Sequence, residues 1–201
     1  MKSLHRQNLY GWSQFDAPRN MDFNTTLWVR PEGNVVFDPV PISEHDAEHL
    51  AELGGVAWIL LTTSDHVRAT RELAQRFGAN VAGPAAERET FPMTCDAWVG
   101  DGDAPVRGAQ AVALAGSKTP GELTFVLEDH TLVTGDLIRA PRGGQLALLP
   151  EAKLQDASAA RASVRRLLDR AAFDAVLVGD GWHAFRDARG LLEDALRRSE
   201  L

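Results

Sequence analysis

Four short polar clusters carry the side chains of this chain that are best suited to chemistry. Each cluster follows an apolar run that is predicted to form a buried strand. The clusters are Asp65-His66, Lys118 within Gly116–Gly121, Gly135-Asp136 and Gly179-Asp180. Glycines at such positions let the backbone approach closely and aim a neighbouring side chain inward. Because ligands collect at the carboxyl edge of α/β sheets, we expect three carboxylates, an imidazole and an amine to meet there.

Charge balance restricts the kinds of site that this cluster of carboxylates can form. Three crowded carboxylates repel one another, so one must take up a proton or a cation must join them. Lys118 can supply one positive charge, and a divalent ion could supply two more.

The segments around the clusters have the patterns of strands and helices that alternate at both ends of the chain. The run 57–62 predicts a strand buried on both faces, and apolar residues every three or four positions predict a helix over 67–77. Further strands are expected at 25–30, 34–38, 80–82, 98–99, 109–114, 123–127, 131–133 and 175–178, and further helices at 43–53, 158–170 and 185–198. We expect an irregular arm over 1–20, with one short strand near Leu9 and Tyr10, and a Gly/Pro loop over 140–150. This order favours an α/β fold with a sheet-on-sheet core and helices outside, as one domain over 1–201.

Composition narrows the function classes. The chain has 201 residues, of which 44% are hydrophobic, and a net charge of -7, which argues against a nucleic-acid-binding surface. Its single cysteine, Cys95, cannot form an internal disulfide, which fits a reducing compartment. No apolar run approaches the roughly 18 residues that a membrane helix needs. We therefore expect a cytoplasmic protein without a membrane partner, and its Trp-rich loops are compatible with a homodimer.

The ordered set of short motifs resembles the metallo-β-lactamase-fold hydrolase superfamily over nearly the whole chain. The matching segments are Asn24-Thr25, Val35 to Pro39, Ile59 to Thr62 before Asp65-His66, Thr119-Pro120-Gly121, Thr134-Gly135-Asp136 and Gly179-Asp180-Gly181. The resemblance implies a metallo-β-lactamase-like αββα sandwich, with two mixed β-sheets flanked by helices and a one- or two-metal centre at one edge.

The metal-binding motif is degenerate when it is compared with that family. The two leading histidines of the His-x-His-x-Asp-His motif would fall on Leu61 and Thr63, or the loop is two residues shorter. Lys118 stands where the family has a third histidine, and Asp180 replaces the last one. By analogy, every ligand of the first metal is lost. The second site is left with Asp65, His66, Asp136 and Asp180.

Two hypotheses follow. In the first, one divalent ion (Zn²⁺, Fe²⁺, Mn²⁺ or Mg²⁺) held by these four residues activates a water for hydrolysis of a small-molecule substrate, with Asp65 and Lys118 in catalytic roles. In the second, no metal binds, Lys118 is the counter-ion, and the pocket is an inactive module that binds an anion or ligand or serves for interaction. Truncation of Lys118 would then cost roughly 3–5 kcal/mol if the cluster is desolvated.

Simpler roles remain open for several of these residues. Asp65 could be only the N-cap of the following helix, and Asp136 and Asp180 could be turn residues. His183 and Trp182 are predicted to form a pocket wall. Arg139 could receive an acidic substrate group or be a solvated loop residue.

Overall fold

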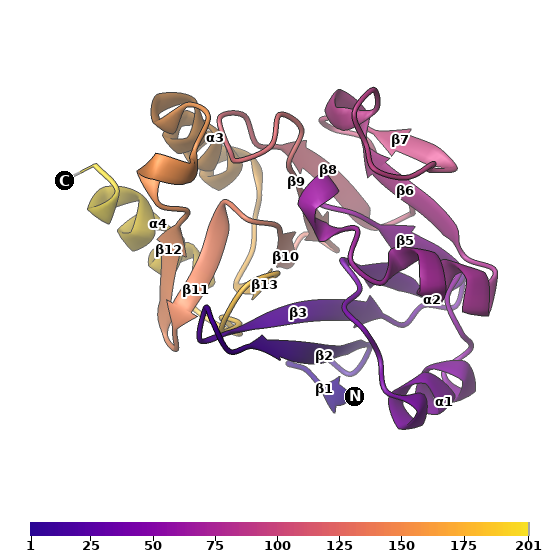
Figure 1. Cartoon of the computed structure of the whole chain (residues 1–201). Helices are drawn as coiled ribbons and strands as arrows, with labels where there is room; N and C mark the ends of the chain where they lie inside the picture. Colours follow the sequence, from indigo (N-terminus) through magenta and orange to yellow (C-terminus); the bar gives the residue numbers. More distant parts are fainter. Residues whose placement is uncertain (201) are drawn as a thin grey trace.

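Two β-sheets pack face to face in the computed structural model of this chain, which describes residues 1–200, and helices cover their outer faces (Figure 1). The first sheet has the order β1 (Lys2–Ser3), β2 (Leu9–Asp16), β3 (Met21–Trp28), β4 (Val35–Phe37), β5 (Trp58–Leu60), β6 (Asn80–Pro84), β7 (Ala97–Val99). The second has the order β13 (Ala175–Val178), β10 (Thr131–Thr134), β9 (Leu123–Leu127), β8 (Ala109–Ala113). A hairpin of β11 (Ile138–Arg142) and β12 (Gln145–Leu148) forms a separate two-stranded sheet, which is hydrogen-bonded through Ala140 to the segment after β13. The helices are α1 (Glu44–Glu52), α2 (Thr70–Phe77), α3 (Ala157–Arg170) and α4 (Ala188–Arg198).

Strand directions bring distant polar clusters to one edge. In the first sheet β4, β5, β6 and β7 run parallel. In the second, β10 pairs with β13 in parallel, so that Thr134 lies beside Val178. β8 also runs in this direction, because β9 is antiparallel to both β8 and β10. The loops after β8, β10 and β13 therefore begin at the same edge of the second sheet.

Alternation of side chains along the strands builds three apolar layers. Val35 and Phe37 of β4 face the space between the sheets, where Phe37 and Phe125 of β9 have ring centroids 5.4 Å apart. Val36 faces the opposite side and packs with Leu50 of α1 and Leu73 of α2. The outer face of the second sheet packs against α3 and α4 in the same manner. The predicted αββα sandwich is thus the architecture of this chain.

Helix starts follow their capping residues. Ser43 is the N-cap of α1, and its hydroxyl accepts a hydrogen bond from the Asp46 amide at 3.1 Å, as predicted. Asp65 is not a helix cap: it lies within a 3₁₀ turn, Ser64–His66, whose N-cap is Thr63, and α2 begins only at Thr70.

Two sequence expectations are wrong. Residues 9–16 form a full strand that pairs with β3 along its length, instead of belonging to an irregular arm. Residues 138–148 form the β11–β12 hairpin, instead of a loop, with a register irregularity between Arg139 and Arg142 that accommodates Pro141. Among the described residues, no helix has the length and apolar character needed to cross a membrane.

Candidate functional site

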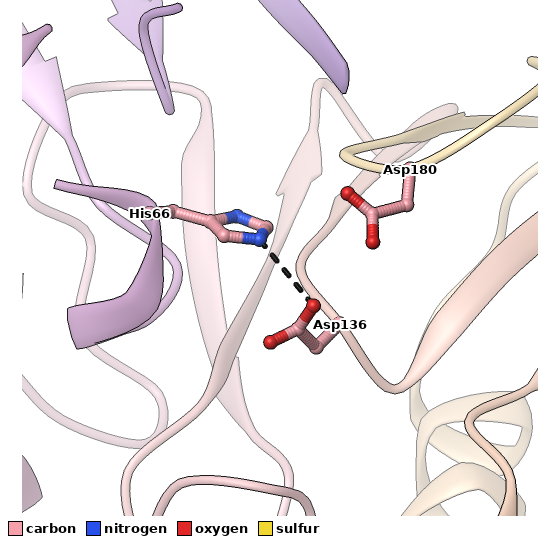
Figure 2. A group of neighbouring side chains, drawn as sticks. All are labelled: His66, Asp136 and Asp180. Carbon is pink, nitrogen blue, oxygen red and sulfur yellow. Dashed lines mark ion pairs between the residues drawn. The ribbon is translucent and has the colours of Figure 1, made fainter. Parts of the chain in front are cut away.

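Three side chains that were predicted to converge lie together at the edge where the strands end. His66 comes from the 3₁₀ turn after β5, Asp136 follows β10, and Asp180 follows β13. Each offers a nitrogen or oxygen atom, and these atoms lie within 4.8 Å of one another. Figure 2 shows the imidazole of His66 and the carboxylate of Asp136 pointing toward each other, with His66 Nε2 3.5 Å from Asp136 Oδ1. All three residues are buried.

Asp65 is not part of this group, contrary to its predicted place in a four-residue ligand set. In the 3₁₀ turn Ser64–His66 the imidazole of His66 faces Asp136, whereas the carboxylate of Asp65 faces Lys118. Asp65 instead forms an ion pair with Lys118, whose Nζ also lies 3.6 Å from Asp136 Oδ2. The Lys118 and Asp65 side chains are 46% and 39% exposed. Truncation of Lys118 should therefore cost about 1 kcal/mol, and not the 3–5 kcal/mol expected for a desolvated cluster.

Asp180 is held by two arginines. Arg68 Nη2 lies 3.2 Å from its Oδ1, and Arg139 Nη2 lies 3.3 Å from its Oδ2. The guanidinium of Arg68 stands over the ring of Phe23, 4.8 Å from its centroid. Arg68 has a φ of 37°, an uncommon backbone conformation for a residue with a side chain. Sequence reasoning missed Arg68 because it lies inside the run that was predicted to be helical.

His66 is fixed from its other side by Asp38, a second residue that sequence reasoning left without a role. Asp38 is 2% exposed and accepts hydrogen bonds from the amide and the hydroxyl of Thr62, at 2.8 and 2.6 Å. His66 Nδ1 lies 2.8 Å from Asp38 Oδ2. Burial opposes protonation of His66, but the charge of Asp38 and hydrogen bonds to Asp136 and Asp38 outweigh it and raise the pKa of His66 to about 9. Burial likewise opposes ionisation of Asp136, yet His66 and Lys118 hold its pKa well below the ordinary value.

These residues open onto a cavity of about 330 Å³ with an excess of positive side chains. Its lining comprises Gln14, Arg19, Phe23, Val40, Pro41, Asp65, His66, Arg68, Lys118, Asp136, Arg139, Leu149, Lys153 and Asp180. Five of these are lysine or arginine and three are aspartate, so the lining is cationic although the whole chain carries a charge of -7.

His183 and Trp182, which were predicted to form a pocket wall, do not line this cavity. His183 is half-buried outside the lining of this cavity, where its Nδ1 accepts a hydrogen bond from the Val178 amide and its ring centroid lies 5.7 Å from that of Phe185. Burial lowers the pKa of His183 to about 4. Trp182 is 63% exposed and lies outside the lining. The reason is that Gly181, with a φ of 98°, turns the chain directly after Asp180.

A family model described as the metallo-beta-lactamase superfamily matches residues 1–198. The chain belongs to the metallo-beta-lactamase superfamily. Among curated proteins it is similar to a hydroxyacylglutathione hydrolase of Acidiphilium cryptum (strain JF-5), with 34% identity over 89 residues. That match covers 42% of this chain and 36% of the relative, so the chain matches well under half of that protein's length.

Solved structures of the superfamily share the fold. The FIM-1 metallo-beta-lactamase from Pseudomonas aeruginosa, in its mono-zinc form, superposes with a TM-score of 0.77 at 12% identity, covering 100% of this chain and 95% of that one. A metallo-beta-lactamase from Pontibacter korlensis gives a TM-score of 0.72 at 18% identity, covering 96% and 94%. At these identities the likeness establishes the architecture alone.

The metal sites expected of the metallo-beta-lactamase superfamily fit this chain poorly. Leu61 and Thr63, which precede Asp65-His66 in the segment compared above with the family's first metal motif, are buried, and neither is a usual metal ligand. The second position offers His66, Asp136 and Asp180, but both oxygens of Asp180 already face guanidinium groups. The buried Oδ2 of Asp136 accepts no hydrogen bond, and its nearest cation is Lys118. As arranged, the carboxylates are neutralised by side chains of this chain.

Proposed function

We propose that this member of the metallo-beta-lactamase superfamily binds a small anionic ligand in the cavity without a metal ion, with cationic side chains in place of the metals. One observation carries the proposal: each aspartate of the lining faces a cation of the chain itself. Asp65 faces Lys118, Asp136 faces His66 and Lys118, and Asp180 faces Arg68 and Arg139.

The charge that remains points to an anion as the ligand. Beyond the residues that face the aspartates of the lining, Lys153 lines the cavity without an ion pair to any described residue, and Arg19 lines it while paired with Asp16. Arginine presents a planar fork of donors that matches carboxylate and phosphate groups. A volume of about 330 Å³ lies at the small end of ligand pockets, which favours a small molecule with one carboxylate or phosphate group.

The test is calorimetric titration of the purified protein with inorganic phosphate, before and after dialysis against EDTA, together with elemental analysis. We expect saturable binding that EDTA does not change, no stoichiometric metal, and affinity at least about tenfold weaker in Lys118→Met and Arg139→Met. Lys2→Met is the matched control, since Lys2 is exposed on β1 and does not line the cavity. Absence of phosphate binding, or binding that disappears with EDTA, would refute the proposal.

A second candidate is a hydrolase with one divalent ion at His66, Asp136 and Asp180. It is favoured by the three ligand atoms within 4.8 Å and by the Asp38–His66 contact, which orients the imidazole. Metal binding at this position requires the carboxylate of Asp180 to break its ion pairs with Arg68 and Arg139. One equivalent of Zn, Fe, Mn or Mg per chain, lost in Asp136→Asn, would favour this candidate over the first.

A further inference from the structure

Two buried glutamates lie behind the cavity without lining it. Glu87 is 1% exposed and Glu122 is 0% exposed. A buried carboxyl group is unfavourable unless hydrogen bonds compensate for its lost hydration. The donors that provide this compensation all belong to the loops that carry cavity residues, which suggests a role in arranging those loops.

Glu87 joins the loop of Asp65 to the loop of Lys118. Its Oε2 accepts a hydrogen bond from the amide of Ser64 at 2.8 Å, directly before Asp65. Its Oε1 accepts a hydrogen bond from the hydroxyl of Thr119, the residue directly after Lys118, at 2.6 Å, and another from the amide of Gly121 at 3.1 Å. One carboxylate thus fixes the spacing of the two residues that form the Lys118–Asp65 ion pair.

Glu122 joins the loop of Lys118 to the loop of Asp136. The amide of Leu137 donates to its two oxygens at 2.9 and 3.2 Å, and the hydroxyl of Ser117 contacts Oε2. Burial raises the pKa of Glu122 to about 8. A neutral Glu122 can accept from Leu137 and donate to Ser117 Oγ, so that a glutamine could make both contacts.

Glycines leave room for both carboxyl groups. A Cβ atom on Gly121 would lie 2.7 Å from Cγ of Glu87, and a Cβ atom on Gly135 would lie 3.0 Å from Oε1 of Glu122. Gly121 belongs to the Thr-Pro-Gly segment next to Lys118, and Gly135 belongs to the Thr-Gly-Asp segment that contains Asp136. The same two motifs therefore also leave space for the side chains of Glu87 and Glu122.

We propose that Glu87 and Glu122 are positioning residues of the anion site: through hydrogen bonds to three loops, they hold Lys118 between Asp65 and Asp136. This inference rests on the proposed function for its ligand. The loop geometry itself can be tested without any ligand.

The experiment combines amide hydrogen exchange with calorimetric titration by inorganic phosphate. Glu87→Gln should speed exchange at Ser64 and Gly121 and leave Leu137 unchanged, while Glu122→Ala should do the reverse. Both variants should bind phosphate at least about tenfold more weakly. Glu122→Gln should restore wild-type exchange and affinity to within about twofold. Where a glutamate variant does not fold, Thr119→Val and Ser117→Ala replace it. Thr119→Val removes the hydrogen bonds of this hydroxyl to Glu87 and Thr63, and Ser117→Ala removes the hydrogen bond to Glu122.

Asp96→Asn is the control, because Asp96 accepts a hydrogen bond from the Val81 amide and does not line the cavity. It should speed exchange at Val81 and leave phosphate affinity unchanged. Unchanged affinity in folded Glu87→Gln and Glu122→Ala, or uniform acceleration of exchange across the chain, would overturn the positioning role. If the wild type binds no phosphate, the proposed function is refuted, and loop-specific exchange alone decides whether the glutamates join the loops.

Discussion

Asp38 shows how one residue outside the cavity lining can determine the state of the site. It lies at the end of β4, accepts two hydrogen bonds from Thr62, and pairs with the buried imidazole of His66. Its φ of 50° is a conformation that aspartate and asparagine tolerate better than other residues with side chains. Replacement by asparagine therefore tests the charge and leaves the backbone in place.

Asp38→Asn should lower the free energy of unfolding by roughly 3 kcal/mol, since it leaves a buried His66 without its main counter-ion. Urea unfolding followed by tryptophan fluorescence measures this change. Asp16→Asn is the control, because Asp16 pairs with the exposed Arg19 and should change stability by less than about 1 kcal/mol. Equal effects of the two substitutions would show that the Asp38–His66 contact contributes no more than a surface pair.

At the residue scale, the sequence could indicate which side chains meet but not how they pair. A strand with a clear run of apolar residues precedes each of His66, Asp136 and Asp180, so their meeting at one sheet edge could be predicted. Arg68 and Asp38 could not be found in this way, because their partners lie 112 and 28 residues away along the chain. The hydrophobic periodicity of the sequence carries no information on which distant residue pairs with Arg68 or Asp38. That pairing is set by the packing of the folded chain.

At the element scale, the glycine at the end of β13 allows the second sheet to approach the loop after β5. A Cβ atom on Gly179 would lie 2.9 Å from Cε1 of His66 and 3.2 Å from the carbonyl oxygen of Thr134. Both neighbours are buried, so neither can move without cost to its own contacts.

Gly179→Ala should therefore lower the free energy of unfolding by about 1–3 kcal/mol and displace the imidazole of His66. Urea unfolding measures the first effect, and NMR signals of the His66 ring report the second. Gly190→Ala offers a matched comparison, because a Cβ atom there meets nothing within 4 Å and the residue lies in α4. That substitution should be stabilising by up to about 1 kcal/mol. Loss of stability in Gly190→Ala, or none in Gly179→Ala, would contradict this account.

The strands that sequence reasoning missed are those in which the pattern of apolar residues gives little indication of burial. The second half of β2, Ser13–Asp16, is largely exposed, so its residues have no alternation of apolar and polar side chains to read. The β11–β12 hairpin contains Pro141 and Gly143-Gly144, which are typical of loops. Its Arg139 nevertheless reaches Asp180, so an unpredicted hairpin contributes a cation to the site.

At the scale of the whole molecule, two buried groups make stability depend on pH in the same direction. The pKa of Glu122 rises from 4.5 to about 8, because burial and the charge of Asp136 outweigh hydrogen bonds from Ser117 and Leu137 and the charge of His66. The pKa of His66 rises from 6.5 to about 9. A group with a raised pKa binds its proton more tightly in the folded state. Its contribution to stability is full below the unfolded pKa and is lost as pH rises through the folded pKa.

The free energy of unfolding should therefore fall as pH rises from 6.5 to about 9, with Glu122 contributing up to about pH 8 and His66 over the whole of that range. Between pH 4.5 and 6.5 the lowered pKa of His183 opposes the effect of Glu122. Urea unfolding at a series of pH values measures the slope. Glu122→Gln, which cannot titrate but keeps both hydrogen-bond partners, should reduce the slope between pH 6.5 and 8 by about half and leave the part that His66 causes. Asp96 accepts a hydrogen bond from the Val81 amide and contacts neither Glu122 nor His66, so Asp96→Asn should retain the slope of the wild type. If the Glu122→Gln and wild-type slopes coincide, Glu122 is ionised in the folded protein, and it then joins the loops of Lys118 and Asp136 as a carboxylate that only accepts hydrogen bonds.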